Sequence, residues 1–271
     1  MNFKVINNIK CYAPELAFDY ENFPSDGFDF LHRIEENHFW FLSRNNIIKI
    51  LISKFTNLRS DVKLLEIGCG TGFVLKGIQK AYPDFKLMGA DIHIFGIIHA
   101  QKRLPDVEFI QMDATQIPFK KEFDVIGAFD VLEHIEQDQV VMGQVYHSLK
   151  NGGLFFVTVP QYQWMWSLTD DLAFHKRRYH RKELIKKLEN AGFEILFISS
   201  FVSFLFPIIL LSRLLKKKNK ESVEISVNKE LELHPILNLF FKTIMKFDEF
   251  LIRLGISLPF GSSLISVAKK N

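Results

Sequence analysis

Apolar and polar positions follow two different patterns between Val62 and Pro160. Short, nearly continuous apolar segments separate stretches in which apolar residues recur every three or four positions, as on one face of a helix. The predicted strands are 63–67, 86–91, 107–112, 123–129 and 154–159, and the predicted helices are 73–82, 94–103 and 138–149. Apolar strands joined by helices predict a parallel sheet covered on both faces, and hence an α/β domain.

The segments on either side of this region are expected to complete a single domain over residues 1–271. Residues 1–30 show little periodicity and are expected to form an irregular lead-in. Two more apolar strands are predicted at 192–198 and 263–268. The expected parts are an N-terminal helical segment at 28–60, the core at 61–200, an apolar helical insertion at 201–258 and a last strand within 259–271.

Composition excludes several classes of protein. A formal net charge of +3 and the lack of a dense basic run argue against a nucleic-acid partner. Two distant cysteines, Cys11 and Cys69, exclude a disulfide framework or a cysteine zinc site and are typical of a reducing cytoplasm. No apolar stretch with a small-residue cleavage site follows Lys4 and Lys10, so no signal peptide is expected.

A glycine-rich turn follows the first predicted strand of the core. Gly68, Gly70 and Gly72 let the backbone turn tightly and approach a ligand, because glycine has no Cβ. Acidic residues end the next three strands: Asp91, Asp113 and Asp130. Ligands of parallel α/β sheets bind beyond the carboxyl ends of the strands, so a nucleotide-like cofactor is expected there.

The spacing of the glycines separates two kinds of cofactor. A dinucleotide fingerprint needs a third glycine at the position of Phe73. Glu66, just before the turn, would repel a pyrophosphate but suits a cationic ligand that carries sulfonium and ammonium groups. Both residues favour an S-adenosylmethionine-like ligand over NAD.

The motif Leu65–Gly72 resembles the first motif of class I S-adenosylmethionine-dependent methyltransferases, and the segments at Asp91, Asp113 and 130–135 resemble its later motifs. The resemblance covers about residues 35–200 and the last strand. It implies a Rossmann-like, doubly wound sheet of seven strands with an antiparallel last strand, and S-adenosyl-L-methionine as cofactor. The implied cofactor-binding residues are Glu66, Gly68, Cys69, Gly70, Gly72, Asp91, Ile92, Asp113, Ala114 and Asp130.

The acceptor of the methyl group is expected near the loop after the strand 154–159. His175 is the first candidate for a general base and His134 is the second, since an imidazole accepts a proton near neutral pH. The alternative for each histidine is a packing or capping role. Residues expected to contact the substrate are His38, Trp40, Arg44, Trp166, Arg177, Arg178 and Tyr179.

Two of these predictions have specific alternatives. The aromatic segment with His38, Trp40 and Arg44 can instead be a helix held over the domain by its aromatic side chains. The two arginines, Arg177 and Arg178, can bridge to Asp170 and Asp171 rather than hold an anionic acceptor. No metal is expected, because a sulfonium is already an activated leaving group.

The insertion allows two interpretations. Residues 195–212 carry no charge, but Pro207 interrupts them and Arg213 and Lys216 follow, so a membrane span is not predicted. The segment 201–218, with a second apolar helix at 236–254, forms either a cap over the acceptor pocket or a peripheral contact with a membrane. A polar linker is expected at 219–232.

These observations predict a cytoplasmic methyltransferase that modifies an oxygen or nitrogen of a small or lipid-linked acceptor. A peripheral position on the inner face of the membrane is the alternative location. One alternative is a catalytically silent cofactor-binding domain that serves as a membrane or complex partner. A weaker alternative is an NAD or nucleotide-sugar enzyme, which Phe73 and Glu66 disfavour.

Overall fold

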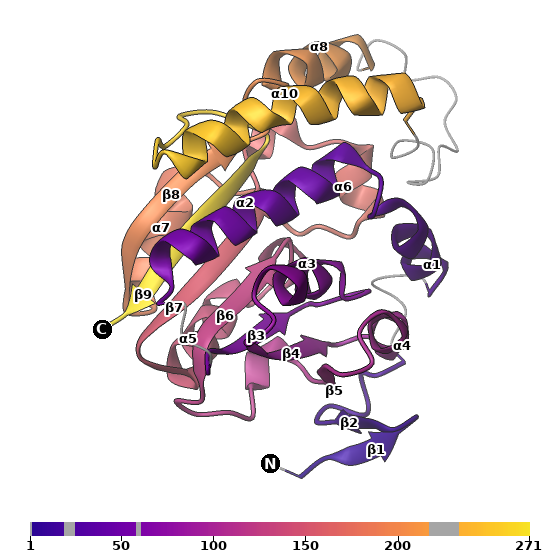
Figure 1. The fold of residues 1–271 in the computed structure, drawn as a ribbon, viewed down its shortest axis with the longest axis vertical. Coiled ribbons are helices and arrows are strands. Elements are labelled where there is room, and N and C mark those ends of the chain that lie inside the picture. Colours follow the sequence, from indigo (N-terminus) through magenta and orange to yellow (C-terminus); the bar gives the residue numbers. More distant parts are fainter. Residues whose placement is uncertain (1, 19–24, 58–60, 217–232) are drawn as a thin grey trace.

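A single mixed β-sheet forms the centre of the computed structural model, which describes residues 2–18, 25–57, 61–216 and 233–271 (Figure 1). Its strands are β1 (Lys4–Ile6), β2 (Ile9–Cys11), β3 (Lys63–Ile67), β4 (Lys86–Asp91), β5 (Glu108–Gln111), β6 (Phe123–Phe129), β7 (Leu149–Pro160), β8 (Phe193–Phe201) and β9 (Ser263–Lys270). They lie in the order β1-β2-β5-β4-β3-β6-β7-β9-β8. β3 to β7 are parallel, and β9 pairs antiparallel with both β7 and β8. The predicted fold class is therefore confirmed.

The sheet has nine strands, so the predicted number of seven is too low by the two strands of one hairpin. β1 and β2 form this hairpin, and β2 extends the sheet by pairing with β5. Asn7 and Asn8 connect the two strands with φ angles of 50° and 62°, values that suit a two-residue hairpin turn. The expected irregular lead-in is thus partly ordered, and its three-residue strands are too short to produce a periodic signal.

The helices cover both faces of the sheet. They are α1 (Ser25–Ile34), α2 (Phe39–Phe55), α3 (Phe73–Ala81), α4 (Ile94–Arg103), α5 (Asp138–Ser148), α6 (Leu168–Leu172), α7 (Arg181–Asn190), α8 (Phe206–Lys216) and α10 (Pro235–Arg253). Short 3₁₀ turns occur at η1 (Ala114–Gln116), η2 (Leu132–His134) and η3 (Gln163–Met165). The segment 28–60 is interrupted between α1 and α2, where His38 caps α2 by accepting a hydrogen bond from the Trp40 backbone N–H.

Two apolar cores lie on opposite faces of the sheet, because successive side chains of a strand point in opposite directions. Leu64 of β3 belongs to the core beneath α2, α3 and α10, whereas Leu65 belongs to the core beneath α5 and α7. This double burial explains why the central strands are apolar throughout rather than alternating.

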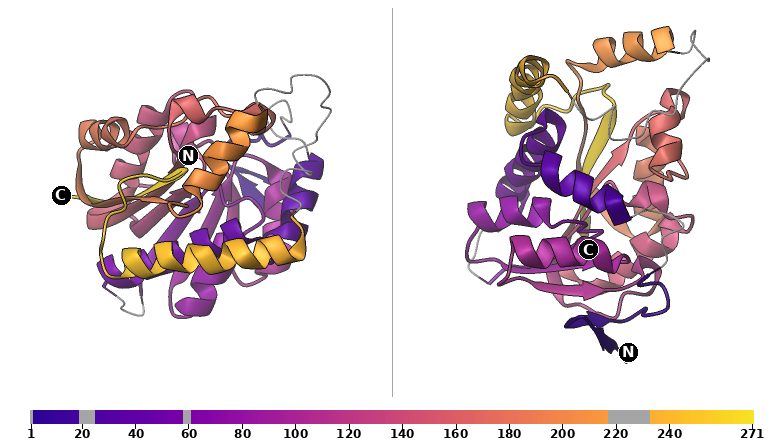
Figure 2. Two further views of the ribbon diagram at one scale, coloured as in Figure 1. Left: turned by 90° about the horizontal axis from the view of Figure 1, so that it is seen from above. Right: turned by 90° about the vertical axis from the view of Figure 1, so that its right-hand side faces the viewer.

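The insertion forms the two helices α8 and α10. β8 ends at Phe201, the first residue of the predicted insertion. α10 packs along α2, and α8 and α10 both lie at the end of the molecule opposite the hairpin β1–β2 (Figures 1 and 2). The predicted linker 219–232 lies outside the described residues. Within the described ranges, no helix is both long enough and apolar enough to cross a bilayer.

Candidate cofactor and acceptor site

A cavity of about 1100 Å³ lies at the carboxyl ends of β3, β4, β6 and β7. Its walls come from distant parts of the chain: the glycine turn, α1 and α2, the loop that carries α6, and both helices of the insertion. α8 contributes Ile209 and Ser212, and Phe241 comes from α10. The cap interpretation of the insertion therefore agrees with the placement of these side chains.

The glycine turn approaches the cavity with its backbone. Gly68 and Gly70 have φ angles of 67° and 48°, in the left-handed region that side chains with a Cβ rarely adopt. A Cβ on Gly68 would lie 2.3 Å from the Val131 side chain, whereas at Gly70 the nearest atom would be 4.0 Å away, in Phe28. Gly68 is therefore needed for packing, and Gly70 leaves open space beside the cavity. Cys69 also lines the cavity, and Gly72 caps α3 outside it.

Asp91 ends β4 and faces the cavity. Its carboxylate accepts hydrogen bonds from the backbone N–H groups of Gly70, at 2.8 Å, and His93, at 2.9 Å. Burial raises the pKa of this carboxyl group above its ordinary value, although the hydrogen bonds oppose the shift. The acid thus joins the glycine turn to the next strand. Ile92 lies beside it on the cavity wall.

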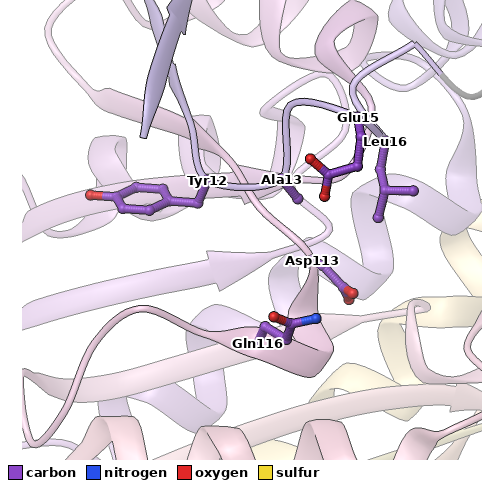
Figure 3. Close-up of a pocket in the computed structure, with 6 residues that line it drawn as sticks. All are labelled: Tyr12, Ala13, Glu15, Leu16, Asp113 and Gln116. Carbon is purple, nitrogen blue, oxygen red and sulfur yellow. The ribbon is translucent and has the colours of Figure 1, made fainter. Parts of the chain in front are cut away.

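Asp113, after β5, caps the 3₁₀ turn η1 and faces two pockets. Its carboxylate accepts hydrogen bonds from the backbone N–H and the hydroxyl group of Thr115, at 2.8 and 2.7 Å. It lines the large cavity together with Ala114. It also borders a smaller pocket of about 60 Å³, across from Glu15 and Leu16 of the N-terminal segment (Figure 3).

Arg44 is the central positive charge among several buried acids. It pairs with Asp130, whose carboxylate also accepts a hydrogen bond from the Thr158 hydroxyl group at 2.9 Å. Burial raises the pKa of Glu66 well above its ordinary value, and the charge of Arg44 opposes this shift. The Oε2 atom of Glu66 has no hydrogen-bond partner among the described residues, although it lies in the cavity wall. An ammonium group of a ligand would satisfy this acceptor.

A buried polar network holds the glycine turn against the N-terminal helices. Arg103 of α4 donates to Glu35 at 2.9 Å and to the Thr71 carbonyl oxygen at 2.9 Å. The Thr71 hydroxyl group donates to Glu35 at 2.5 Å. Glu35, Thr71 and Arg103 were not predicted to belong to the site, although the position of Glu35 just before the aromatic segment with His38 and Trp40 was a usable signal.

His175 and Asp170 form a hydrogen-bonded pair in the loop after β7. Nδ1 of His175 lies 2.9 Å from Oδ1 of Asp170, which also accepts from Nε of Arg178 at 2.7 Å. Burial would favour the neutral carboxyl group, but the bonds from His175 and Arg178 hold the pKa of Asp170 far below its ordinary value. An ionised Asp170 requires the proton of a neutral His175 on Nδ1, which leaves Nε2 as an acceptor.

His134 lies beside this pair, with its ring centroid 4.7 Å from that of His175. Burial and the neighbouring His175 lower the pKa of His134 to about 3, so this histidine is neutral near pH 7. A base with such a low proton affinity is a poor general base near neutral pH, and among the described residues His134 has no carboxylate on its ring like that of Asp170 on His175. His175 is therefore the better placed of the two candidates.

Glu133 adds an unsatisfied acid to this part of the cavity. Its side chain is fully buried, and neither carboxylate oxygen has a hydrogen-bond partner among the described residues. One ligand atom from each of Glu133, His134 and His175 lies within 4.8 Å of the others, a spacing that could hold a metal ion. Burial first, and then the nearby Asp130, raises the pKa of Glu133 well above its ordinary value.

The predicted substrate residues fall into two groups. His38, Trp40, Arg44 and Arg178 line the cavity. Burial lowers the pKa of His38 to about 4, and the guanidinium group of Arg44 stacks 4.6 Å from the Trp40 ring centroid. The helix-packing alternative and the cavity-facing interpretation therefore both describe this segment.

Trp166, Arg177 and Tyr179 do not line the cavity. Trp166 donates to Asp171, and Arg177 pairs with Glu136 and Asp138. Tyr179 is fully buried and donates to Asp138 at 2.7 Å. Direct substrate contact by these three residues is thus not supported, because their polar groups are already paired away from the cavity. The predicted alternative of a bridge to Asp170 or Asp171 holds for Arg178, which pairs with Asp170, but not for Arg177.

The strand order and the cavity define the class of this domain. From β3 to β9 the strands have the order of a Rossmann-like sheet with an antiparallel last strand, and the glycine turn and three acids gather at its carboxyl edge. A family model described as a methyltransferase domain matches residues 64–153. Residues 64–153 therefore form a methyltransferase domain, and this part of the chain is similar to the class I S-adenosylmethionine-dependent methyltransferases, whose cofactor is S-adenosylmethionine.

Known proteins of this class resemble the chain at modest identity. A probable S-adenosylmethionine-dependent methyltransferase of Mycolicibacterium smegmatis is 25% identical over 60% of this chain and 62% of its own length. A sterol 24-C-methyltransferase of Candida albicans is 27% identical over 51% of this chain and 42% of its own. The chain thus spans about half the length of the curated relatives it matches.

A solved structure supports the fold. Phosphoethanolamine N-methyltransferase 2 of Haemonchus contortus, in complex with S-adenosyl-L-methionine, superposes with a TM-score of 0.61. Its sequence identity is 17%, and the match covers 93% of this chain and 58% of that one. At this identity the likeness concerns the fold alone.

Proposed function

We propose that the protein transfers a methyl group from S-adenosylmethionine to an oxygen or nitrogen atom of a small or lipid-linked acceptor. The observation that carries the proposal is the His175–Asp170 pair, with its 2.9 Å hydrogen bond, in the same cavity as the glycine turn. A glycine turn that binds the cofactor, with no general base beside it, would equally suit a domain that binds the cofactor without catalysing a reaction. The relatives do not settle the acceptor atom, since their names include a sterol C-methyltransferase and a malonyl-[acyl-carrier protein] O-methyltransferase.

The cavity residues fit the proposed cofactor. The unsatisfied Oε2 of Glu66 suits the ammonium group, and Asp91 is placed to accept hydrogen bonds from the ribose hydroxyl groups. Asp113 would lie near the adenine, beside Ile92 and Ala114. Several acids in one cavity favour a cationic ligand by electrostatic attraction.

When bound, S-adenosylmethionine supplies a methyl group on a sulfonium, an activated leaving group. In the proposed reaction, Nε2 of His175 would accept the proton of the acceptor hydroxyl group as its oxygen takes the methyl group, and the carbon–sulfur bond that breaks would leave the neutral thioether. Asp170 keeps the proton on Nδ1 and stabilises the imidazolium that results. His38 and Trp40 wall the acceptor, and most of the rate increase comes from holding the two reactants together.

Calorimetry with S-adenosylhomocysteine tests the cofactor half of the proposal. We expect binding by the native protein and a marked loss of affinity in Asp91→Ala. Glu108→Ala is the matched control, because this acid begins β5, does not line the cavity, and forms a half-exposed pair with Lys10. No binding at high micromolar concentration, or undiminished binding by the Asp91 variant, would contradict the proposal. Tighter binding of NAD would instead support the dinucleotide alternative.

Transfer of a radiolabelled methyl group into lipid and glycan extracts tests the catalytic half. Native protein is expected to label a component of an extract, and His175→Ala is expected to label it far more slowly. If S-adenosylhomocysteine binds but no fraction is ever labelled, the silent-domain alternative is favoured.

A further inference from the structure

The insertion exposes an unusually large set of apolar side chains. We name these residues the cap surface; each is between 44% and 74% exposed. They are Phe204, Ile208 and Leu211 at α8, and Ile236, Leu239, Phe240, Phe247, Phe250 and Leu254 at α10. Soluble proteins rarely expose a contiguous apolar patch of this kind without a partner for it.

The exposed residues of α10 follow helical spacing and occupy one face. Steps of three, four or seven residues, which return to the same side of a helix, lead from Ile236 through Phe240, Phe247 and Phe250 to Leu254. The opposite face holds the buried Met245 and packs along α2. α10 is therefore apolar on the side that faces solvent as well as on the side that faces the protein, whereas an ordinary surface helix is polar toward solvent.

Ring contacts make the surface continuous between the two helices. Phe204, just before α8, lies 5.7 Å from Phe247 of α10. Phe206 at the start of α8 lies 6.0 Å from Phe260 and 6.2 Å from the exposed Trp164 of η3. The patch thus reaches from α10 to the loop that leads into the cavity.

The charges on the exposed side of α10 have one sign. Lys242, Lys246 and Arg253 are exposed. The two acids of the helix are turned inward: Asp248 is fully buried and accepts from the Ser203 backbone N–H, and Glu249 accepts from Asn46. A basic and apolar face of this kind is complementary to a bilayer with anionic headgroups.

We propose that the cap surface docks on an anionic lipid bilayer and turns the cavity toward it. The same two helices line the cavity on their other side, through Ile209, Ser212 and Phe241. An acceptor held in the bilayer would thus reach the cavity without crossing water. This last step rests on the proposed function, whereas the docking does not.

Flotation of the full chain with lipid vesicles tests the docking. We expect the native protein to float with phosphatidylcholine–phosphatidylglycerol vesicles and to bind pure phosphatidylcholine at least about tenfold less. The triple variant Phe240→Asp, Phe247→Asp, Phe250→Asp is expected to lose flotation, and Lys242→Glu with Lys246→Glu to lose the preference for anionic lipid.

Val140→Asp is the matched control, because Val140 is 44% exposed on α5, outside the cap surface. This variant is expected to float like the native protein. Binding of S-adenosylhomocysteine, measured on every variant, separates loss of docking from loss of folding. If the native protein fails to bind the cofactor analogue but still floats, only the proposed function fails.

Two outcomes would overturn the docking proposal. One is flotation that the triple variant does not reduce. The other is an absence of flotation accompanied by a dimer in light scattering that the triple variant disrupts, which would assign the surface to a second copy of the chain.

Discussion

The ion pair of Arg44 and Asp130 allows a quantitative test of how the cavity is held together. The perturbation is Arg44→Met, which keeps a long side chain but removes the charge. The side chains of Arg44 and Asp130 are 9% and 17% exposed, so the substitution leaves a largely buried carboxylate with the Thr158 hydroxyl group as its remaining neutral donor. Breaking one partner of a buried pair costs about 3–5 kcal/mol.

We expect the lower end of this range, about 3 kcal/mol, because Asp130 borders a cavity that water can enter. For a chain of this size, that loss lowers the melting temperature by roughly 6–12 °C. Adding Asp130→Asn should recover most of the loss, since Thr158 can donate equally well to a carboxamide oxygen. Thermal and urea denaturation measure both effects.

The matched control is Lys76→Met. Lys76 pairs with Glu36, and both side chains are nearly half exposed, at 45% and 47%. Such a surface pair contributes about 0–1 kcal/mol. If Arg44→Met costs no more than this control, or if Asp130→Asn fails to compensate, the account of Arg44 as the charge that stabilises the acids of the cavity is refuted.

Three further predictions concern protonation, catalysis and metal. Burial raises the pKa of Asp248 to about 6, so the folded protein binds this proton more tightly than the unfolded chain and its stability rises as pH falls from about 7 toward 4. Relative to Asp248→Asn, the native protein should gain about 1–2 kcal/mol between about pH 7.5 and pH 5 in urea titrations, and an unchanged difference would contradict the shift. His175→Ala should lower methyl transfer at least about 100-fold without weakening S-adenosylhomocysteine binding, and imidazole should restore part of the rate; equal losses in both measurements would indicate a structural role. Dialysis against EDTA should leave transfer unchanged, whereas a loss restored by Zn²⁺ or Mn²⁺ would assign Glu133, His134 and His175 as metal ligands.

The central sheet was predictable because burial on both faces leaves a strong local signal. β3, β4 and β6 have the predicted bounds, and α4 does as well. The hairpin β1–β2 was missed because its strands have three residues each, and their pairing with β5 depends on a contact almost 100 residues away in the chain.

The site was predictable in part, for the same reason. Parallel strands place their carboxyl ends at one edge, so the gathering of the glycine turn with Asp91, Asp113 and Asp130 follows from strand order. Which side chains pair with one another does not follow from strand order. Arg177 and Arg178 are neighbours in the sequence, yet one points into the cavity wall and the other toward Glu136 and Asp138.

By itself, the sequence determined the fold class, the kind of cofactor and the edge of the sheet at which the cofactor is expected to bind. It could do so because apolar periodicity and glycine conformation act over a few residues. The tertiary structure decided what each polar group contacts. It joined Asp170 to His175 and Arg178, surrounded Arg44 with acids, and left the cap surface exposed. These outcomes depend on distances between distant segments, and on which charges the fold removes from water.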